Sequence, residues 1–356
     1  MFANDNLSGV LEQVEWLSAR GYVFSEEAQE QLGALYEGDQ AVRLGSAFAT
    51  AAPAVTTSSP AGGVPEEIRL PEASLWDAAE GRMFTTTIVS RGLFVIELDG
   101  DWREVPIDGA GSLAGIVLDA PRDLIWVGSG VVDQTPEPET AFRGVIALDR
   151  TTLEERRRVP APEGVTISDI AVGPDGTIYG SDPIGGAIYS ATTADTVMQP
   201  FIAPGTFRSP QGIAVRDDNS AFYVSDYRYG LAQVMISSRA VYRMGAVEPM
   251  LLDGVDGLWL HGNQLIAVQN GLNPHRITAF ELDARVGVIA SHRILERANP
   301  EWTEPLGGVI SGDTLYYIGT GQWDLYGEAG GLREGMSARP SQIRTLQLVE
   351  TASQLP

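Results

Sequence analysis

The feature that most constrains the fold is a pattern that occurs six times between residues 72 and 311. Each copy has a variable residue, then small or apolar residues, a strand, a turn and a second strand. Successive copies start 42 to 54 positions apart, at Glu72, Ala114, Ser168, Gln211, Asp256 and Leu306. Third strands follow, as at Ala187–Ala191 and Ile277–Leu282, and usually fourth strands. Four strands in each unit of about 40–50 residues is the period of a β-propeller.

The repeats therefore predict an all-β fold, a six-bladed β-propeller over residues 66–350. A β-sandwich with many hairpins is the alternative, but a sandwich gives no reason for six repeats. The last copy supplies only three strands, and we expect Glu67–Leu70 to provide the fourth. Such pairing would close the ring and remove an exposed sheet edge.

A different periodicity precedes the repeats. Apolar residues recur at helical spacing at Leu7, Val10, Leu11, Val14 and Leu17. Ser25–Tyr36 and Ala41–Ala51 also have helical patterns, and Ser25 followed by two Glu residues is a typical helix start. Ala52–Pro65, rich in Ala, Pro, Ser, Thr and Gly, is typical of a linker. We therefore predict a short helical segment with a linker in residues 1–60, outside the channel.

The composition excludes several kinds of chemistry. The chain contains no Cys, which excludes disulfides, thiolate zinc sites and a Cys nucleophile. All 24 basic residues are Arg, which excludes a P-loop Lys and Schiff-base catalysis. The net charge of −23 argues against nucleic acid as a partner, because phosphates would be repelled. A bound cation or a saline habitat suits this surface, and a soluble acidic protein is the simpler explanation.

The sequence leaves the cellular location open. No stretch approaches 18 consecutive apolar residues, so we expect no membrane span. Acidic residues at positions 5, 12 and 15 interrupt any apolar core of a signal peptide in residues 1–20. A chain that has lost a leader would be periplasmic or secreted, and otherwise the protein would be cytoplasmic.

Propeller topology brings the six copies together at one end of the channel. First strands line the channel, so the residues that begin them lie around its upper end. Second strands return to that end with Thr87, Ser129, Asp182, Asp226, Asn270 and Thr320. Carboxylate and amide oxygens around one axis suit a hard cation such as Ca²⁺, and the alternative is that they bind channel water. Two long loops, 130–142 and 321–340, are expected there as pocket walls or as solvated insertions.

Several short motifs resemble those of a known family. They are Pro71-Glu72, Ser209-Pro-Gln-Gly-Ile-Ala214, Tyr223-Val-Ser-Asp-Tyr227, Val255-Asp-Gly-Leu258 and Ala267-Val-Gln-Asn-Gly271. As a set they resemble the gluconolactonase and senescence-marker-protein family of six-bladed propellers over residues 66–350. Diisopropylfluorophosphatase and strictosidine-synthase-like proteins have related propellers. The N-terminal helices resemble the end of a helical-repeat segment that precedes the propeller in some bacterial members.

The resemblance implies a divalent cation, which the family holds with a Glu, two Asn and an Asp. These ligands correspond to Glu72, Ser168, Gln211 and Asp256, with Asp169 able to replace Ser168. Asn270, brought to the same rim, completes the candidate ligands. Ser168 and Gln211 depart from the Asn of the family pattern. Ca²⁺ is the expected ion, Zn²⁺ and Mg²⁺ are alternatives, and a metal-free propeller also stays open.

The leading functional hypothesis is a hydrolase of small esters or lactones, in which the cation polarises the substrate carbonyl. Asp182, Asp226 or Asp256 is the expected general base for a water molecule, and His275 is a further acid–base candidate. One alternative is a non-enzymatic propeller that binds a small ligand or a protein partner. Another is a metal-free enzyme that resembles strictosidine synthase. The hydrolase hypothesis rests on analogy between folds, because β-propellers support many different activities.

Overall fold

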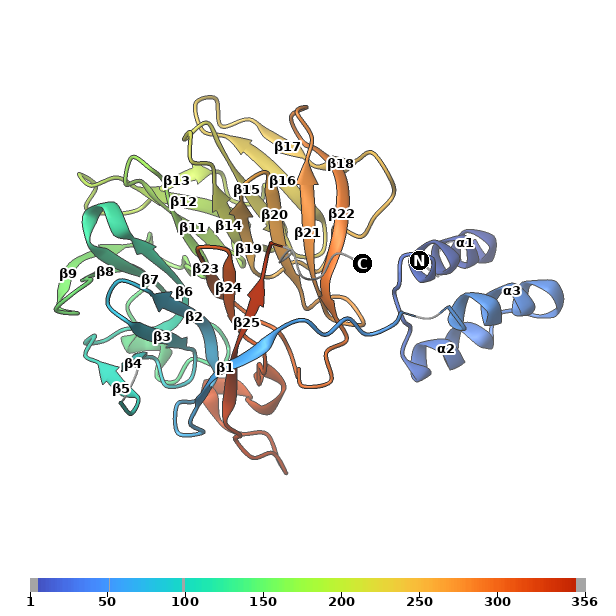
Figure 1. Cartoon of the computed structure of the whole chain (residues 1–356), viewed down its shortest axis with the longest axis horizontal. Helices are drawn as coiled ribbons and strands as arrows, with labels where there is room; N and C mark the ends of the chain where they lie inside the picture. Colours follow the sequence, from blue (N-terminus) through green and yellow to red (C-terminus); the bar gives the residue numbers. More distant parts are fainter. Residues whose placement is uncertain (1–5, 51, 98–99, 350–356) are drawn as a thin grey trace.

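The computed structural model is a six-bladed β-propeller with three helices before its first strand (Figure 1). It describes residues 6–50, 52–97 and 100–349. Each blade is an antiparallel sheet, and the innermost strands of successive blades contact one another around a central channel. The predicted fold class is therefore confirmed, including the helices that precede the propeller.

Strand order within the blades is regular, from the channel outwards. Blade one contains β2 (Pro71–Asp77), β3 (Arg82–Thr87), β4 (Leu93–Glu97) and β5 (Arg103–Val105). Blade two contains β6 (Ser112–Asp119), β7 (Leu124–Gly130), β8 (Gly144–Asp149) and β9 (Glu155–Pro160). Blade three contains β10 (Ile170–Val172), β11 (Ile178–Asp182), β12 (Ala187–Ala191) and β13 (Gln199–Ile202).

The second half of the ring adds one irregularity. Blade four contains β14 (Pro210–Val215), β15 (Ala221–Asp226), β16 (Gly230–Met235) and β17 (Val241–Arg243). Blade five contains β19 (Leu258–His261), β20 (Gln264–Gln269), β21 (Arg276–Leu282) and β22 (Val288–Arg297), and β18 (Gly245–Ala246) pairs with β22 in parallel. Blade six contains β23 (Gly308–Ser311), β24 (Thr314–Ile318), β25 (Ser341–Gln347) and β1 (Ser59–Val64).

Apolar residues hold the blades together face to face. The alternating pattern of the second strands places residues such as Phe84, Ile125 and Phe222 between neighbouring sheets, where they are fully buried. Burial of such side chains contributes about 1.5–3 kcal/mol each. The repeated hydrophobic pattern thus specifies the stacking of one blade on the next, which fixes where the inner strands begin.

The ring closes with a strand from the start of the propeller, although not with the predicted residues. Strand β1 pairs with β25, from Ser59 opposite Thr345 to Val64 opposite Ser341. The prediction of Glu67–Leu70 as this strand is wrong, because those residues form a turn and bends. β1 is an edge strand with a bulge and contains Pro60, which has no N–H to donate and is tolerated at an edge. Its Ser-Pro-Ala-Gly-Gly sequence has no β-branched residue before Val64, so its composition resembles a linker.

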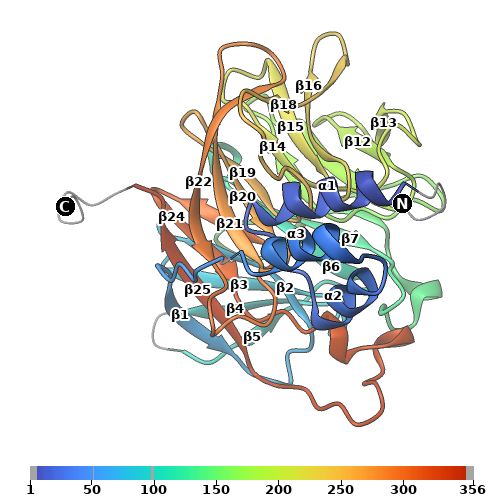
Figure 2. The same ribbon diagram turned by 90° about the vertical axis from the view of Figure 1, so that its right-hand side faces the viewer.

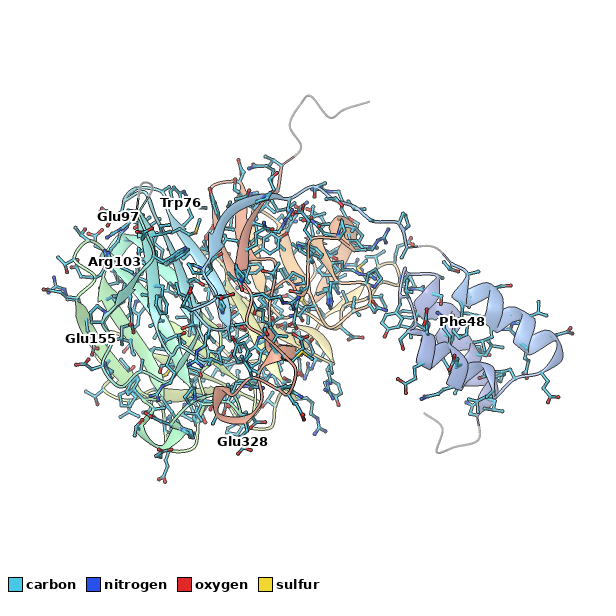
Figure 3. All side chains as sticks on the ribbon, turned by 90° about the horizontal axis from the view of Figure 1, so that it is seen from below. Phe48, Trp76, Glu97, Arg103, Glu155 and Glu328 are labelled. Atoms are coloured by element: carbon cyan, nitrogen blue, oxygen red, sulfur yellow. The ribbon has the colours of Figure 1, made fainter. Side chains whose placement is uncertain are left out.

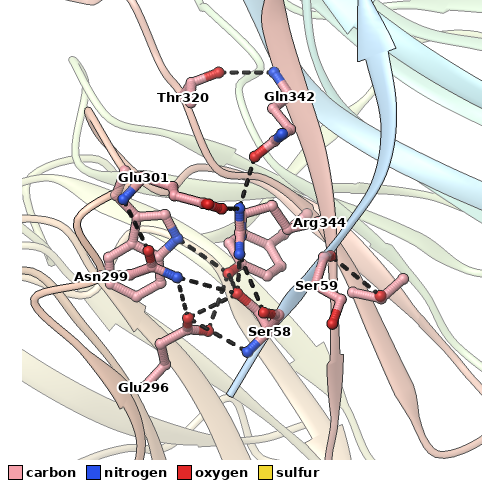
Figure 4. A network of polar contacts seen from close by, with 11 residues as sticks. Ser58, Ser59, Glu296, Asn299, Glu301, Thr320, Gln342 and Arg344 are labelled. Carbon is pink, nitrogen blue, oxygen red and sulfur yellow. Dashed lines mark hydrogen bonds and ion pairs between the residues drawn. The ribbon is translucent and has the colours of Figure 1, made fainter. Parts of the chain in front are cut away.

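A buried polar network joins this closure to the neighbouring blade (Figure 4). The Ser58 hydroxyl donates to Glu296 Oε1 at 2.7 Å and accepts from Arg344 Nε at 2.8 Å. The Tyr317 hydroxyl lies 3.1 Å from Glu296 Oε2, Asn299 donates to Oε1, and Arg344 is paired with Glu301. Glu296 and Arg344 are almost fully buried, and both charged groups have several partners. The network therefore satisfies its buried charges within the closure itself.

The three helices form a separate cluster beside blade five (Figures 2 and 3). They are α1 (Leu7–Ser18), α2 (Glu26–Gly33) and α3 (Gly38–Phe48). The predicted helix start at Ser25 is confirmed, since its hydroxyl accepts from Ala28 N at 3.2 Å. Their apolar faces pack together around Leu11 and Leu44. No helix in the described part of the chain is long and apolar enough to cross a membrane.

Candidate active site at the channel mouth

Bulges at the starts of inner strands bring side chains into the channel mouth. Pairing of β2 with β3 shifts between Pro71 and Ala73, which leaves Glu72 as the extra residue. Pairing of β14 with β15 shifts between Pro210 and Ile213, around Gln211, and β6 has the same irregularity around Ala114. A bulge turns the extra residue away from the regular alternation of a strand. In five of the six repeats the variable first residue thus lines the channel mouth, at Glu72, Ala114, Ser168, Gln211 and Asp256.

Backbone hydrogen bonds connect neighbouring blades at the channel mouth. Gly115 N donates to Ser168 O at 3.0 Å, Gly212 N to Asp256 O at 2.9 Å, and Gly307 N to Glu72 O at 3.0 Å. Each donor lies in an even-numbered blade and each acceptor in the next blade around the ring. A Cβ at Gly212 would lie 2.5 Å from Leu258 N, so this approach requires glycine. The glycines of the repeat therefore hold the carboxylate-bearing blades in place.

Three carboxylates from alternate blades line the small cavity that results. Glu72 of blade one, Asp169 of blade three and Asp256 of blade five surround it, together with Ser168 and Gln211. Its volume is about 30 Å³, enough for at least one water molecule or an ion but not for an organic substrate. Leu306, predicted to line the mouth, is instead buried with Ile318 and Ile343, and backbone at Gly307 and Gly308 lines the cavity.

Each carboxylate has fixed hydrogen-bond donors. Trp323 Nε1 donates to Glu72 Oε2 at 2.8 Å, and Asn270 Nδ2 donates to Asp256 Oδ2 at 2.9 Å. Tyr227 holds the orientation of Asn270, because its hydroxyl donates to Asn270 Oδ1 at 3.0 Å. The Asp169 carboxylate accepts from the backbone N–H groups of Ile170 at 2.9 Å and Ile213 at 3.3 Å.

Burial and mutual repulsion raise the pKa values of these groups. Burial, followed by the negative charge of Asp256, raises the pKa of Glu72 well above its ordinary value, against the stabilising bond from Trp323. Burial raises the pKa of Asp169 to about 7 and that of Asp256 to about 6. Desolvation disfavours a carboxylate, and neighbouring carboxylates add to this cost. The mouth is consequently a site where a proton or a cation would be bound favourably.

Sequence reasoning missed one further carboxylate, Glu304. Burial, then the charges of Asp256 and Asp324, raises the pKa of Glu304 to about 7. Glu304 also contributes to the raised pKa of Glu72 and of Tyr227, so it lies within electrostatic reach of the mouth. It stands in the loop before β23, outside the repeated pattern. Its position two residues before the sixth repeat was the only signal available in the sequence.

The side chains around the cavity offer oxygen atoms that suit a hard cation, but they are not arranged as a metal site. Among the described residues, no group of three or more Asp, Glu, His or Cys side chains is arranged to hold a metal ion. Glu72 and Asp256 nevertheless each use only one carboxylate oxygen in the bonds to Trp323 and Asn270, and Gln211 adds an amide oxygen. All are oxygen donors of the kind that Ca²⁺ prefers.

The other predicted acid–base residues lie outside this cavity. Asp226 accepts from the backbone N–H groups of Arg208 and Ser209 and forms an ion pair with Arg243 at 2.8 Å. Asp182 accepts from the N–H groups of Ile184 and Gly185, so its carboxylate closes a turn. His275 Nδ1 contacts Leu272 O at 3.1 Å, and burial lowers its pKa. None of the three lines the cavity around Glu72.

The two long loops meet above the mouth and enclose a larger hollow. Ala329 N donates to Asp133 O at 2.8 Å, which joins loop 321–340 to loop 130–142. The hollow has a volume of about 640 Å³, and its lining includes Thr166, Ile184 and Trp323. Trp323, whose indole N–H is bonded to Glu72, connects this hollow to the channel carboxylates. It is large enough for a small organic molecule.

Comparison with known proteins places the fold among propellers. No protein-family model and no curated protein matches the sequence. Solved structures with a similar fold include the calcium-binding protein regucalcin from Agrobacterium tumefaciens, with a TM-score of 0.52 and 16% identity over 81% of this chain and 93% of that chain.

Two further similar structures are enzymes or carry an enzyme name. Virginiamycin B lyase from Staphylococcus aureus has a TM-score of 0.53 and 15% identity over 72% of this chain and 80% of that chain. A protein provisionally named a gluconolactonase has a TM-score of 0.52 and 14% identity over 83% of this chain and 93% of that chain. At these identities the likeness establishes the six-bladed propeller, and its distant relatives in structure are mostly enzymes with different reactions.

Proposed function

We propose that this protein is a hydrolase of small esters or lactones that acts at the channel mouth with the help of a divalent cation, most simply Ca²⁺. The observation that carries the proposal is the convergence of Glu72, Asp169 and Asp256 from alternate blades on one small cavity. The charged groups that shift the pKa of Glu72 are all carboxylates, which a bound cation would offset.

Glu72, Asp256 and Gln211 would hold the cation, with Ser168 and Asn270 beside them. Bound there, a divalent cation would polarise an ester carbonyl and stabilise the developing oxyanion. Trp323 and Asn270 fix the orientation of the two acidic ligands through bonds of 2.8 and 2.9 Å. Such orienting partners commonly support metal ligands.

Glu304 and Asp169 are the proposed acid–base groups. Each has a pKa raised to about 7, which suits proton transfer near neutral pH because both protonation states are populated. Asp169 is held by two backbone N–H groups, whereas Glu304 is in a loop. We therefore favour Glu304 as the base that takes a proton from the attacking water.

The substrate would occupy the hollow between the two long loops, since the mouth cavity holds no more than water or an ion. Trp323 lines this hollow and contacts Glu72, so a carbonyl placed beside Trp323 would face the carboxylates. Similarity in fold to a protein provisionally named a gluconolactonase supports a cyclic ester, and similarity to a calcium-binding regucalcin supports the cation.

The test is hydrolysis of a panel of five- and six-membered lactones and aryl esters, with and without chelator and with Ca²⁺, Mg²⁺ or Zn²⁺ restored. We expect turnover of at least one lactone, loss with chelator and recovery with Ca²⁺. His261→Gln is the matched control, because His261 lies at the opposite end of β19 and bonds Asp313 at 2.9 Å. Absence of turnover on every substrate with each ion would refute the proposal.

A second candidate is a metal-free enzyme that uses the same carboxylates as acid and base. The observation that favours it is that no three acidic or histidine side chains of the described residues are arranged as a metal site. In that case activity would persist in chelator, and the purified protein would contain no stoichiometric metal. Metal analysis of the protein as purified separates the two candidates.

A further inference from the structure

A cavity between the helices and blade five has the opposite charge to the channel mouth. It has a volume of about 420 Å³ and lies where the end of α1 meets strands β21 and β22. Arg20, Arg276, Arg297 and His292 line it, and no acidic residue is among the lining side chains of the described residues. In a chain with a net charge of −23, such a basic concavity requires an explanation.

The arginines are placed where they repel one another. Arg276 on β21 and Arg297 on β22 are direct cross-strand partners. Like charges in this position are destabilising. A Cβ built at Gly21 would lie 3.0 Å from Arg297 Nη1 and 3.9 Å from Arg276 Nη1, so both guanidinium groups approach the same point. Gly21 has a φ of +73° and, having no side chain, leaves room for them.

Backbone carbonyl oxygens hold these guanidinium groups without neutralising them. Arg276, 2% exposed, donates to Arg20 O at 3.2 Å and Gly21 O at 2.6 Å. Arg297 donates to Pro53 O through Nε, and Arg20 donates to Pro249 O and Trp16 O. Within the described residues, no carboxylate forms an ion pair with any of the three. Burial, and then the charge of Arg297, lowers the pKa of Arg276 to about 10.

A second and independent observation concerns Ser18, the last residue of α1. Ser18 lines the same cavity and is 2% exposed, yet its hydroxyl has no hydrogen-bond partner among the described residues. Leaving a buried hydroxyl unpaired costs free energy, so such a group often marks a missing ligand. Here the hydroxyl would be a donor beside cationic donors.

We propose that this cavity binds an oxyanion, a free phosphate or the phosphate group of a small phosphomonoester, between the helical segment and blade five. The Nη atoms of Arg297 remain available after its bond to Pro53, and Ser18 adds a neutral donor. Guanidinium groups match phosphate oxygens in geometry and charge. The bound anion would offset the Arg276–Arg297 repulsion and join two parts of the molecule.

Titration of the full chain with sodium phosphate by calorimetry at pH 7 tests the site, with sodium chloride at equal ionic strength as the blank. We expect saturable binding of one phosphate. Arg297→Gln should weaken it by about tenfold or more, because a charge-assisted hydrogen bond is lost. Arg285→Gln is the control, since it removes one positive charge from an exposed pair with Asp283 on the same blade and should leave binding unchanged.

The Ser18→Ala variant should weaken phosphate binding without lowering the stability of the phosphate-free protein. Without phosphate the variant should keep or gain thermal stability, because an unpaired buried hydroxyl is removed. With phosphate it should bind more weakly than wild type. A structural role for Ser18 alone would lower stability and leave binding unchanged.

Glycerol phosphate in place of inorganic phosphate identifies the source of the anion. Tighter binding of glycerol phosphate assigns the site to a phosphomonoester, and weaker binding assigns it to free phosphate. No saturable binding of either ligand to wild type, or equal affinity in wild type and Arg297→Gln, would overturn the proposal. These measurements do not depend on turnover at the channel mouth.

Discussion

The ring closure and the channel mouth of this propeller hold carboxylates in opposite ways. At the ring closure, Glu296 is surrounded by donors, and Arg344 lies in the same network. At the channel mouth, Glu72, Asp169 and Asp256 are buried beside one another, and their pKa values rise. The two carboxylate oxygens of Glu296 accept hydrogen bonds from Ser58, Asn299 and Tyr317.

The two regions therefore have different roles in the protein. A fully satisfied buried network fixes one conformation and contributes to stability. A cluster of like charges costs stability and persists where a ligand or a proton is to be held. Donors contact both oxygens of Glu296 at the closure, whereas the mouth carboxylates have one or two donors each and also face one another.

The largest effect is expected at the closure. Arg344→Met removes the donor of Ser58 and the partner of Glu301 and should lower the free energy of unfolding by about 3–5 kcal/mol, measured by urea denaturation. Arg103→Met, which removes an exposed pair with Glu97 at 3.6 Å, is the control and should change it by about 0.5 kcal/mol or less. Equal small effects in both variants would mean that the network is not a stabilising element.

Substitution at the mouth should affect activity instead. Glu72→Gln and Asp256→Asn should each lower kcat/KM by about 100-fold or more on the best lactone and remove most bound metal. Stability should stay equal or rise, because one of the repelling charges disappears. Full activity together with higher stability in both variants would show that these groups only repel each other.

Stability should fall as the pH rises, which is the direction expected for a carboxyl group whose pKa is raised by folding. In the unfolded chain Asp169 loses its proton near its ordinary pKa of 3.8, whereas in the folded protein it does so near 7. The folded state therefore binds more protons between these values, and stability falls as pH rises from about 4 to 7. Asp169→Asn should remove up to about 4 kcal/mol of this loss, measured without added metal by thermal or urea unfolding at each pH. Identical pH profiles for the two proteins would contradict the assignment.

The smallest effect on turnover is expected from the helical segment. Deletion of residues 1–52 removes the contacts of Arg276 with Arg20 and Gly21 and should lower stability or solubility. Turnover should change by no more than about twofold, because none of the described residues before β1 lines the cavity of the channel carboxylates. Loss of all turnover in a well-folded truncated protein would show that the helices belong to the site.

The repeated part of the molecule could be predicted from sequence because its signal is redundant. Segments such as Gly212–Val215 and Gly257–Leu260 combine a glycine for close approach with apolar residues for interblade packing. Six copies of the same combination identify the fold even where one copy is weak. For the same reason the first residue of each copy pointed to the channel mouth, where Glu72, Gln211 and Asp256 lie.

Residues outside the repeat could not be predicted in this way. β1 is held by pairing with β25 rather than by its own propensity, so its Gly- and Pro-containing sequence indicated a linker. Glu304 reaches the electrostatic environment of Asp256 from an irregular loop, whose course no local pattern specifies. Asp226 and Asp182 were expected at the mouth because of strand polarity, but Asp182 accepts from N–H groups of its own turn, and Asp226 accepts from Ser209 N and pairs with Arg243.

The pairing of β1 with β25 also has a consequence for how the chain acquires its fold. Thr345 donates to Ser59 O across a sequence separation of 286 residues, and Ser58 meets Arg344 across the same separation. During synthesis, five blades can form from consecutive hairpins while the sixth still lacks its last strand. Contacts of such long range are slow to form, because the loop between them must first be ordered. Ring closure is therefore expected as the final and slowest step of folding, and until then β25 and β1 present open edges at which two chains can pair.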